Sequence, residues 1–173
     1  MRARQLIVAV VAASLVACAA ASASAAPLSR CAGAASPRTL CGHVTVPLDR
    51  SGAVPGTLAL NVKALAPRGG GASSGTVLAL AGGPGQAAVP LLQQFASALG
   101  PVLNTRELVT FDQRGTGGSG RLRCAALTSR GSLSSVIGRC ATELGPRRTA
   151  YTTAASVADV EAVRAALGVD KLV

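Results

Sequence analysis

Two glycine-rich loops, about thirty residues apart along the chain, carry the residues that could do chemistry. Residues 82–85 (GGPG) follow the apolar run 76–81 (TVLALA), and residues 112–117 (DQRGTG) follow the apolar run 108–111 (LVTF). Open α/β sheets place their sites in glycine-rich turns at the carboxyl ends of buried strands. Glycine lets backbone N–H groups approach a bound molecule closely, so these turns could stabilise negative charge that develops on a substrate oxygen.

Three segments together resemble a known family. In chain order they read LAGGPG, LVTFDQRGTGGSG and DVEAVRAALGVDKLV, and the resemblance covers about Cys41 to Val173. They resemble the α/β-hydrolase serine peptidases of the proline iminopeptidase and secreted tripeptidyl aminopeptidase type. The resemblance implies an α/β fold with a mostly parallel sheet and flanking helices. It also implies an exopeptidase that releases proline or short amino-terminal pieces from peptides.

The family's mechanism uses Ser, Asp and His in that chain order, with the Ser in a G-x-S-x-G turn after the fifth strand. The resemblance ends at Val173, where that strand would begin. We therefore expect residues 26–173 to be the amino-terminal portion of a hydrolase domain, cut before the nucleophile turn. The catalytic Ser, Asp and His are expected outside this chain, which alone is predicted to be inactive.

Within this resemblance, residues 82–85 take the place of the loop that supplies one N–H of the oxyanion hole. Gly83 is the preferred backbone donor and Gly85 the second, because Pro84 has no N–H. The family usually has a His directly before this loop, and Ala81 stands there instead.

The second loop is expected to be structural. Asp112 and Arg114 are predicted to hold neighbouring loops at the floor of the site, since no partner base for a catalytic role is evident. Residues 115–120 also match G-x-G-x-x-G, but no helical pattern follows, and no acidic residue stands at the spacing of a dinucleotide site. His43, Asp112 and Ser119 have the chain order of a chymotrypsin-type triad, but the chain lacks that fold's strand count. Neither pattern is favoured, and no cofactor is expected.

The first 25 residues are typical of an export signal, in which a basic start precedes an apolar stretch too short to span a bilayer comfortably. Residues 23–25 (ASA) match a signal-peptidase site, and residues 15–18 (LVAC) match a bacterial lipobox that would lipidate Cys18. Both routes stay open, and both predict a protein that is secreted or held in the cell envelope. A non-catalytic envelope lipoprotein, or a binding module on the same scaffold, is the alternative to the hydrolase.

Four cysteines follow this signal, namely Cys31, Cys41, Cys124 and Cys140. In an oxidising compartment they predict two disulfides, for which three connectivities exist. Local pairing, Cys31 with Cys41 and Cys124 with Cys140, closes short loops and is preferred. No CxxC pair is present and the single His is not part of a metal-ligand spacing pattern, so no metal site is expected.

The charge balance is basic, with 17 Lys plus Arg against 7 Asp plus Glu. Nucleic-acid binding would need clustered charge interleaved with aromatic side chains. The basic residues are scattered apart from pairs at 121/123 and 147/148, and aromatic residues are almost absent. We therefore expect a solvated basic surface and no nucleic-acid partner. The expected partners are a peptide substrate in the complete protein and a membrane reached only through a lipid on Cys18.

The strands that must position the loops follow from periodicity and turn residues. Residues 43–46 and 58–65 alternate and predict two antiparallel strands. Residues 76–81 and 108–111 are apolar on both faces and predict buried strands. A further strand is expected from residue 169, and in the hydrolase architecture the strand at 76–81 lies between this strand and 108–111.

Three helices are expected between and after these strands. They are placed at 89–99, at 133–144 and from Thr152 or Thr153 to Gly168. The last helix is predicted to bury an apolar stripe made of Val157, Val160, Val163 and Leu167.

Overall fold

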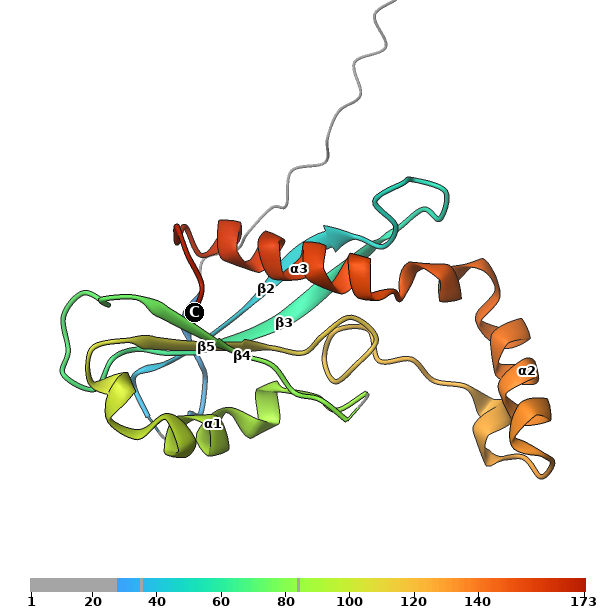
Figure 1. The fold of residues 1–173 in the computed structure, drawn as a ribbon, viewed down its shortest axis with the longest axis horizontal. Coiled ribbons are helices and arrows are strands. Elements are labelled where there is room, and N and C mark those ends of the chain that lie inside the picture. The colour runs from blue at the N-terminus through green and yellow to red at the C-terminus, as the bar shows by residue number, and fades with distance from the viewer. Residues whose placement is uncertain (1–27, 35, 84) are drawn as a thin grey trace, which may run out of the picture.

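The computed structural model describes residues 28–34, 36–83 and 85–173 of the chain. The predicted signal segment, the lipobox and Pro84 lie outside the described residues. The centre is a five-stranded sheet in the order β1-β2-β3-β5-β4 (Figure 1). The strands are β1 (Ser29–Arg30), β2 (Thr39–Pro47), β3 (Thr57–Leu65), β4 (Thr76–Ala79) and β5 (Glu107–Phe111).

The sheet is mixed rather than mostly parallel. The pairs β1–β2, β2–β3 and β3–β5 are antiparallel, and β4 pairs with β5 in parallel. The β2–β3 connection is a short loop, which can join antiparallel neighbours, whereas parallel neighbours need a crossover. The helical segment 89–104 supplies that crossover between β4 and β5. The α/β class is therefore confirmed, and the expectation of a mostly parallel sheet is wrong.

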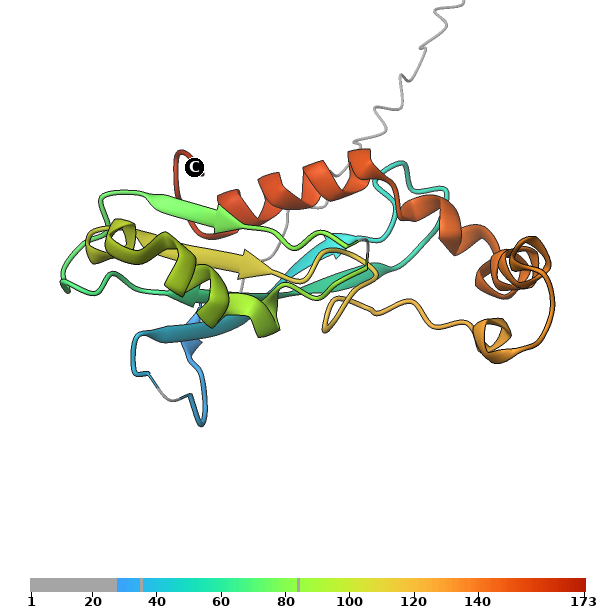
Figure 2. The ribbon, with the colours of Figure 1, turned by 60° about the horizontal axis from the view of Figure 1, so that its bottom comes forward.

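Helices cover both faces of the sheet (Figure 2). The helix α3 (Thr153–Ala166) packs on the face to which β4 contributes Leu78. The helix α1 (Leu92–Leu99) packs on the opposite face, to which the same strand contributes Val77 and Ala79. Successive side chains of a strand point to opposite faces, so an apolar run such as β4 needs cover on both sides.

The helix bounds follow local signals in the sequence. The helix α2 (Leu133–Leu144) has the predicted ends, with Ser132 Oγ accepting a hydrogen bond from the Ser135 N–H at 3.3 Å and Gly145 at φ 58°. The predicted helix at 89–99 begins as a 3₁₀ turn, η1 (Val89–Leu91), and becomes α-helical only at Leu92. Pro90 lies in that first turn, where its missing N–H costs nothing.

Only part of the predicted stripe on α3 is buried. Val163 is fully buried in the core, and Val160 and Leu167 pack against the core from its edge. Val157 is 64% exposed, so its inclusion in the stripe was wrong. A helix advances about 100° per residue, so residues spaced strictly by three drift backward around it, and Val157 has turned away from the face that holds Val163.

The residues after α3 return to the free edge of β4. Leu172 forms a parallel bridge with Thr76, the Leu78 N–H donates to the Val173 carbonyl at 3.0 Å, and the Val173 N–H donates to the Thr76 carbonyl at 3.0 Å. The expected order, with the strand at 76–79 between β5 and the last segment, is therefore confirmed.

Val163→Ala should lower the free energy of unfolding by about 2 kcal/mol, because it removes two methyl groups from a fully buried position. Val157→Ala makes the same chemical change on the exposed side of the same helix and should stay within about 0.5 kcal/mol of the wild type. Urea denaturation of both variants measures the difference. Equal losses would contradict the orientation of α3.

Candidate functional site

A hollow of about 420 Å³ lies at the carboxyl ends of β4 and β5. The Gln113 side chain joins its two loops, since Nε2 donates to the Ala81 carbonyl at 3.1 Å. Gly83 and Gly85 line the hollow in the positive-φ region, at 124° and 90°, which side chains other than glycine rarely adopt. The lining residues are Ala81, Gly82, Gly83, Gly85, Gln86, Gln113 and Thr116.

Asp112 is a buried framework residue that directly precedes Gln113. It is 2% exposed, and its Oδ1 accepts from the Val89 N–H at 2.9 Å, where the segment leading into α1 begins. Its Oδ2 accepts from Asn61 Nδ2 at 3.0 Å and from the Gly118 N–H at 2.8 Å. Three donors from three parts of the chain thus converge on one carboxylate, which fixes β3, η1 and the second loop around it.

The glycines of the second loop are explained by close packing. A Cβ on Gly117 would lie 2.2 Å from Asp112 Oδ2, and a Cβ on Gly118 would lie 2.8 Å from Asn61 Nδ2. Gly120 has φ 64°, and a Cβ there would meet Leu58 at 2.4 Å. Residues 121–124 continue without helical structure. A dinucleotide site would need these glycines to open a helix, so the structure gives that alternative no support.

Arg114 is also a framework residue, and its partner is Asp159 from α3. The guanidinium and the carboxylate form a two-bonded pair, Nε to Oδ2 at 2.7 Å and Nη2 to Oδ1 at 2.8 Å. Arg114 Nη1 also donates to the carbonyls of Leu48 at 2.8 Å and Ala150 at 2.6 Å. Arg50 Nη2 adds a second cation to the same carboxylate at 2.7 Å. Asp159 is fully buried, so this cluster is closed to solvent on its acidic side.

Sequence reasoning missed Asp159, although a signal was present. Asp159 precedes the buried Val163 by four residues, and residues four apart share one face of a helix. An acidic residue on the apolar face of a predicted helix has to find a buried cationic partner, because an unpaired buried charge is strongly unfavourable. The pattern could therefore have directed attention to Arg114.

The triad pattern is not assembled. Ser119 is fully buried, and its Oγ accepts from the Asn61 N–H at 2.9 Å. His43 is exposed on β2, and among the described residues no hydrogen bond joins it to Asp112 or Ser119. Ser119 therefore serves the framework.

One pentapeptide, residues 71–75 (GASSG), does match G-x-S-x-G. Because the nucleophile turn is expected outside this chain, the position of this match in the fold has to be compared with that of a nucleophile turn. The pentapeptide lies in the connection from β3 to β4 and directly precedes β4, so it is at the amino end of that strand, whereas the hollow is at the carboxyl end. Ser73 Oγ donates to the Gly75 carbonyl at 2.6 Å and accepts from the Glu107 N–H at 2.9 Å. This serine closes a turn, and its position does not fit a nucleophile elbow.

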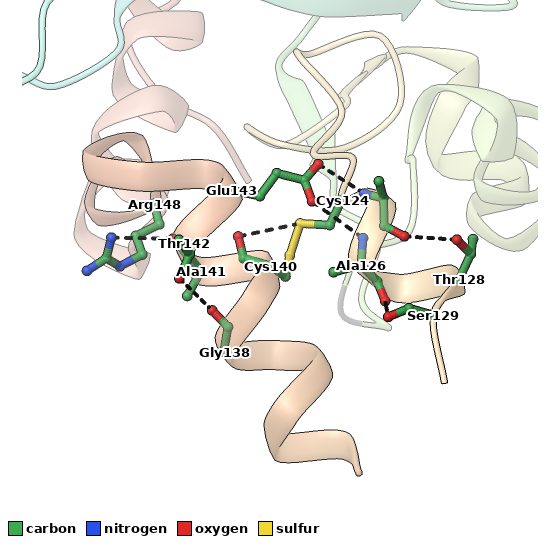
Figure 3. Close-up of a disulfide and its surroundings, with 11 residues drawn as sticks. Cys124, Ala126, Thr128, Ser129, Gly138, Cys140, Ala141, Thr142, Glu143 and Arg148 are labelled. Atoms are coloured by element: carbon green, nitrogen blue, oxygen red, sulfur yellow. Dashed lines mark hydrogen bonds between the residues drawn. A yellow bond between two sulfur atoms is a disulfide. The ribbon is translucent and has the colours of Figure 1, made fainter. Parts of the chain in front are cut away.

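Both disulfides are present with the preferred local pairing. Cys31–Cys41 links the chain after β1 to β2, and Cys124–Cys140 links the start of the turn η3 (Ala125–Thr128) to α2 (Figure 3). Structural disulfides form and persist in oxidising environments, so the pairing indicates such a compartment. Cys18, the lipidation candidate, lies outside the described residues.

No family model matches this chain, and a search of curated proteins found no match. Within residues 28–173, leaving out 35 and 84, no helix has the length and apolar character needed to cross a bilayer.

Asp159→Asn should lower the free energy of unfolding by about 3–5 kcal/mol, because it leaves the buried charge of Arg114 uncompensated. Glu161→Gln is the matched control, since Glu161 also pairs with an arginine, Arg164, but on the exposed surface of the same helix. That change should cost far less, because an exposed ion pair is screened by water. Chemical denaturation of both variants tests the contrast, and similar losses would contradict the framework role of Asp159.

Glu107→Gln should stabilise the protein at pH 7 and have no effect near pH 3. Burial raises the pKa of Glu107, with a weaker opposing hydrogen bond from Thr76. The carboxyl of Glu107 then binds its proton more tightly in the folded protein than in the unfolded chain. The free energy of unfolding therefore falls as pH rises from the unfolded-state pKa of about 4.3 through the higher folded-state pKa. The Glu107→Gln variant has no carboxyl at this position, so it does not lose this stability as pH rises.

Glu161→Gln gives the opposite trend, because a hydrogen bond from Arg164 lowers the pKa of Glu161. Its stabilisation is present above the unfolded pKa and is lost as pH falls, so this variant should be weakened only at neutral pH. Melting temperatures across the pH range measure both trends. A Glu107→Gln variant that is less stable than the wild type at pH 7 would refute the assignment.

Proposed function

We propose that residues 28–173 form the amino-terminal half of an exported α/β-hydrolase of the serine exopeptidase type, acting on peptides. In this proposal the hollow beside Gly83 receives the carbonyl oxygen of the scissile peptide bond. The backbone N–H of Gly83, with Gly85 as the second candidate, donates to the negative charge that develops on that oxygen. Asp112 and Arg114 hold the floor under it.

The observation that carries the proposal is the parallel pairing of Leu172 and Val173 with β4. A strand that continued in this direction would end at the same sheet edge as the 82–85 loop. Parallel strands deliver their carboxyl-end loops to one edge, and α/β-hydrolases place the serine on the turn after such a strand. The serine would thus arrive next to the Gly83 donor. The GGPG and DQRGTG motifs at the ends of β4 and β5 support the same assignment.

The remaining chemistry belongs to groups outside this chain. A serine attacks the carbonyl, a histidine takes the serine's proton, and an aspartate orients the histidine. The acyl-enzyme that results is hydrolysed by water. Residues 28–173 then contribute one part of the oxyanion hole and the frame that holds it.

The purified chain alone should hydrolyse neither aminoacyl nor tripeptidyl chromogenic substrates above the buffer rate. Ser73→Ala and Ser119→Ala versions serve as controls and should give the same background. Turnover that a serine-directed phosphonate abolishes, and that Ser73→Ala also abolishes, would overturn the account of the 71–75 turn.

The DNA that follows codon 173 gives the direct test. A continuation that encodes G-x-S-x-G after the strand can be joined to this chain, and the joined protein should release amino-terminal residues from peptides. Gly83→Pro removes the proposed donor and also forces the loop to change, because proline cannot adopt φ 124°. It should therefore lower kcat by at least about a hundredfold. A joined protein without peptidase activity, or unrelated downstream sequence, would favour the non-catalytic envelope protein instead.

A further inference from the structure

Residues 121–150, here called the arm, extend beyond one end of the sheet. Figures 1 and 2 both show α2 at the end of this projection. Inside the arm, η3 packs on α2, and η4 (Gly145–Ala150) leads back to α3. The Cys124–Cys140 disulfide staples η3 to α2, and Glu143 accepts hydrogen bonds from the N–H groups of Ala125 and Ala126 at 3.0 and 3.4 Å (Figure 3).

The arm exposes aliphatic side chains from both of its elements. Leu127 of η3 is 63% exposed, and Leu133 and Ile137 of α2 are 75% and 54% exposed. Leu133 and Ile137 are four residues apart, so they lie on one face of α2. Val136 is the buried hydrophobic residue of this helix. Most of the large aliphatic surface of the arm therefore faces outward.

The same arm is strongly cationic. Residues 121–150 contain six arginines, at 121, 123, 130, 139, 147 and 148, and one acidic residue, Glu143. Glu143 is exposed, and its carboxylate accepts hydrogen bonds from backbone N–H groups at the start of η3. Arg139 is fixed within the arm, because Nη2 donates to Ser129 Oγ and Nη1 donates to Ser135 Oγ, both at 2.6 Å. It lies on the side of α2 away from Leu133 and Ile137, since a helix advances about 100° per residue. Arg130 is exposed in the adjoining loop.

We propose that this arm docks on an anionic phospholipid surface, with Leu127, Leu133 and Ile137 entering the interface. Aliphatic side chains and nearby arginines are what such surfaces bind, the former by burial among acyl chains and the latter through headgroup phosphates. The arm projects from the sheet domain. A bilayer interface is deformable and can accommodate a projecting element, whereas a folded protein partner would need a cavity of complementary shape. Nucleic acid is disfavoured because residues 121–150 contain no aromatic side chain on which bases could stack.

This surface is separate from lipidation at Cys18, and the test keeps the two apart. The chain has no Trp, so Leu133→Trp introduces a single reporter at the arm. Val157→Trp puts the same reporter on α3, at a position that is 64% exposed and outside the arm. Both versions carry Cys18→Ala in the full chain, so that no acyl group can anchor it.

Vesicles of equal parts phosphatidylcholine and phosphatidylglycerol should shift the emission of the Leu133→Trp protein to the blue. Brominated acyl chains should quench that emission, and the Val157→Trp protein should respond to neither. Pure phosphatidylcholine vesicles and high salt should weaken the effect, because the attraction is partly electrostatic. An unshifted Leu133→Trp emission, or equal responses from the two reporters, would overturn the proposal whatever the amino-terminal segment does.

Variants without a reporter test the same surface by vesicle sedimentation. Arg130→Gln should reduce partitioning about fivefold, and Arg30→Gln, the same change on exposed β1, should leave it unaltered. Leu127→Ser with Leu133→Ser should reduce it at least tenfold. Binding of the wild-type chain to soluble polyglutamate but not to vesicles would identify an acidic polypeptide as the partner and refute the lipid surface.

Discussion

The ion pair between Arg114 and Asp159 connects more of this structure than any other described interaction. Arg114 follows β5, Asp159 lies on α3, and the same guanidinium reaches carbonyls after β2 and at the end of η4. Removing two charges from water is costly, and the cost is recovered only when the geometry is correct and the remaining hydrogen bonds are made. The pair therefore favours a single position of α3 against the sheet.

Asp112 and Gln113, which precede Arg114 in the same loop, each hold a different part of the structure. Asp112 gathers donors from β3, η1 and the loop itself, while Gln113 bonds the Ala81 carbonyl beside the hollow. Gly117, Gly118 and Gly120 bring the backbone of this loop so close to Asp112, Asn61 and Leu58 that a Cβ atom would not fit. Successive residues of one loop thus fix the helical layer, the sheet and the rim of the hollow.

The arm depends on different forces. It buries few apolar side chains, and its cohesion comes from the Cys124–Cys140 disulfide, the Glu143 contacts and the bonds of Arg139. A disulfide stabilises such a small unit mainly by restricting its unfolded state. The arm can therefore expose aliphatic and cationic side chains, whereas the sheet domain buries most of its aliphatic side chains in its core.

The sequence by itself determined the features that depend on neighbours along the chain. The ends of α2, the cap of α3 at Thr152, the buried strand at 108–111 and the local disulfide pairing all follow from turn residues, periodicity and short loops. The strand predicted at 76–81 is shorter and less buried than expected, because it ends at Ala79 and Leu80 is 43% exposed. The resemblance of three motifs also predicted the order in which β4 lies between β5 and the last segment.

Only the tertiary structure decided which distant residues meet. It paired Arg114 with Asp159, brought Asn61 to Asp112 and gathered arginines and aliphatic residues on one projecting arm. It also showed that the glycines at 117–120 serve close packing and that the sheet is mixed. The physical reason is that burial and charge pairing are settled by contacts across long sequence separations, whereas capping, turn geometry and helical phase are settled within a few residues.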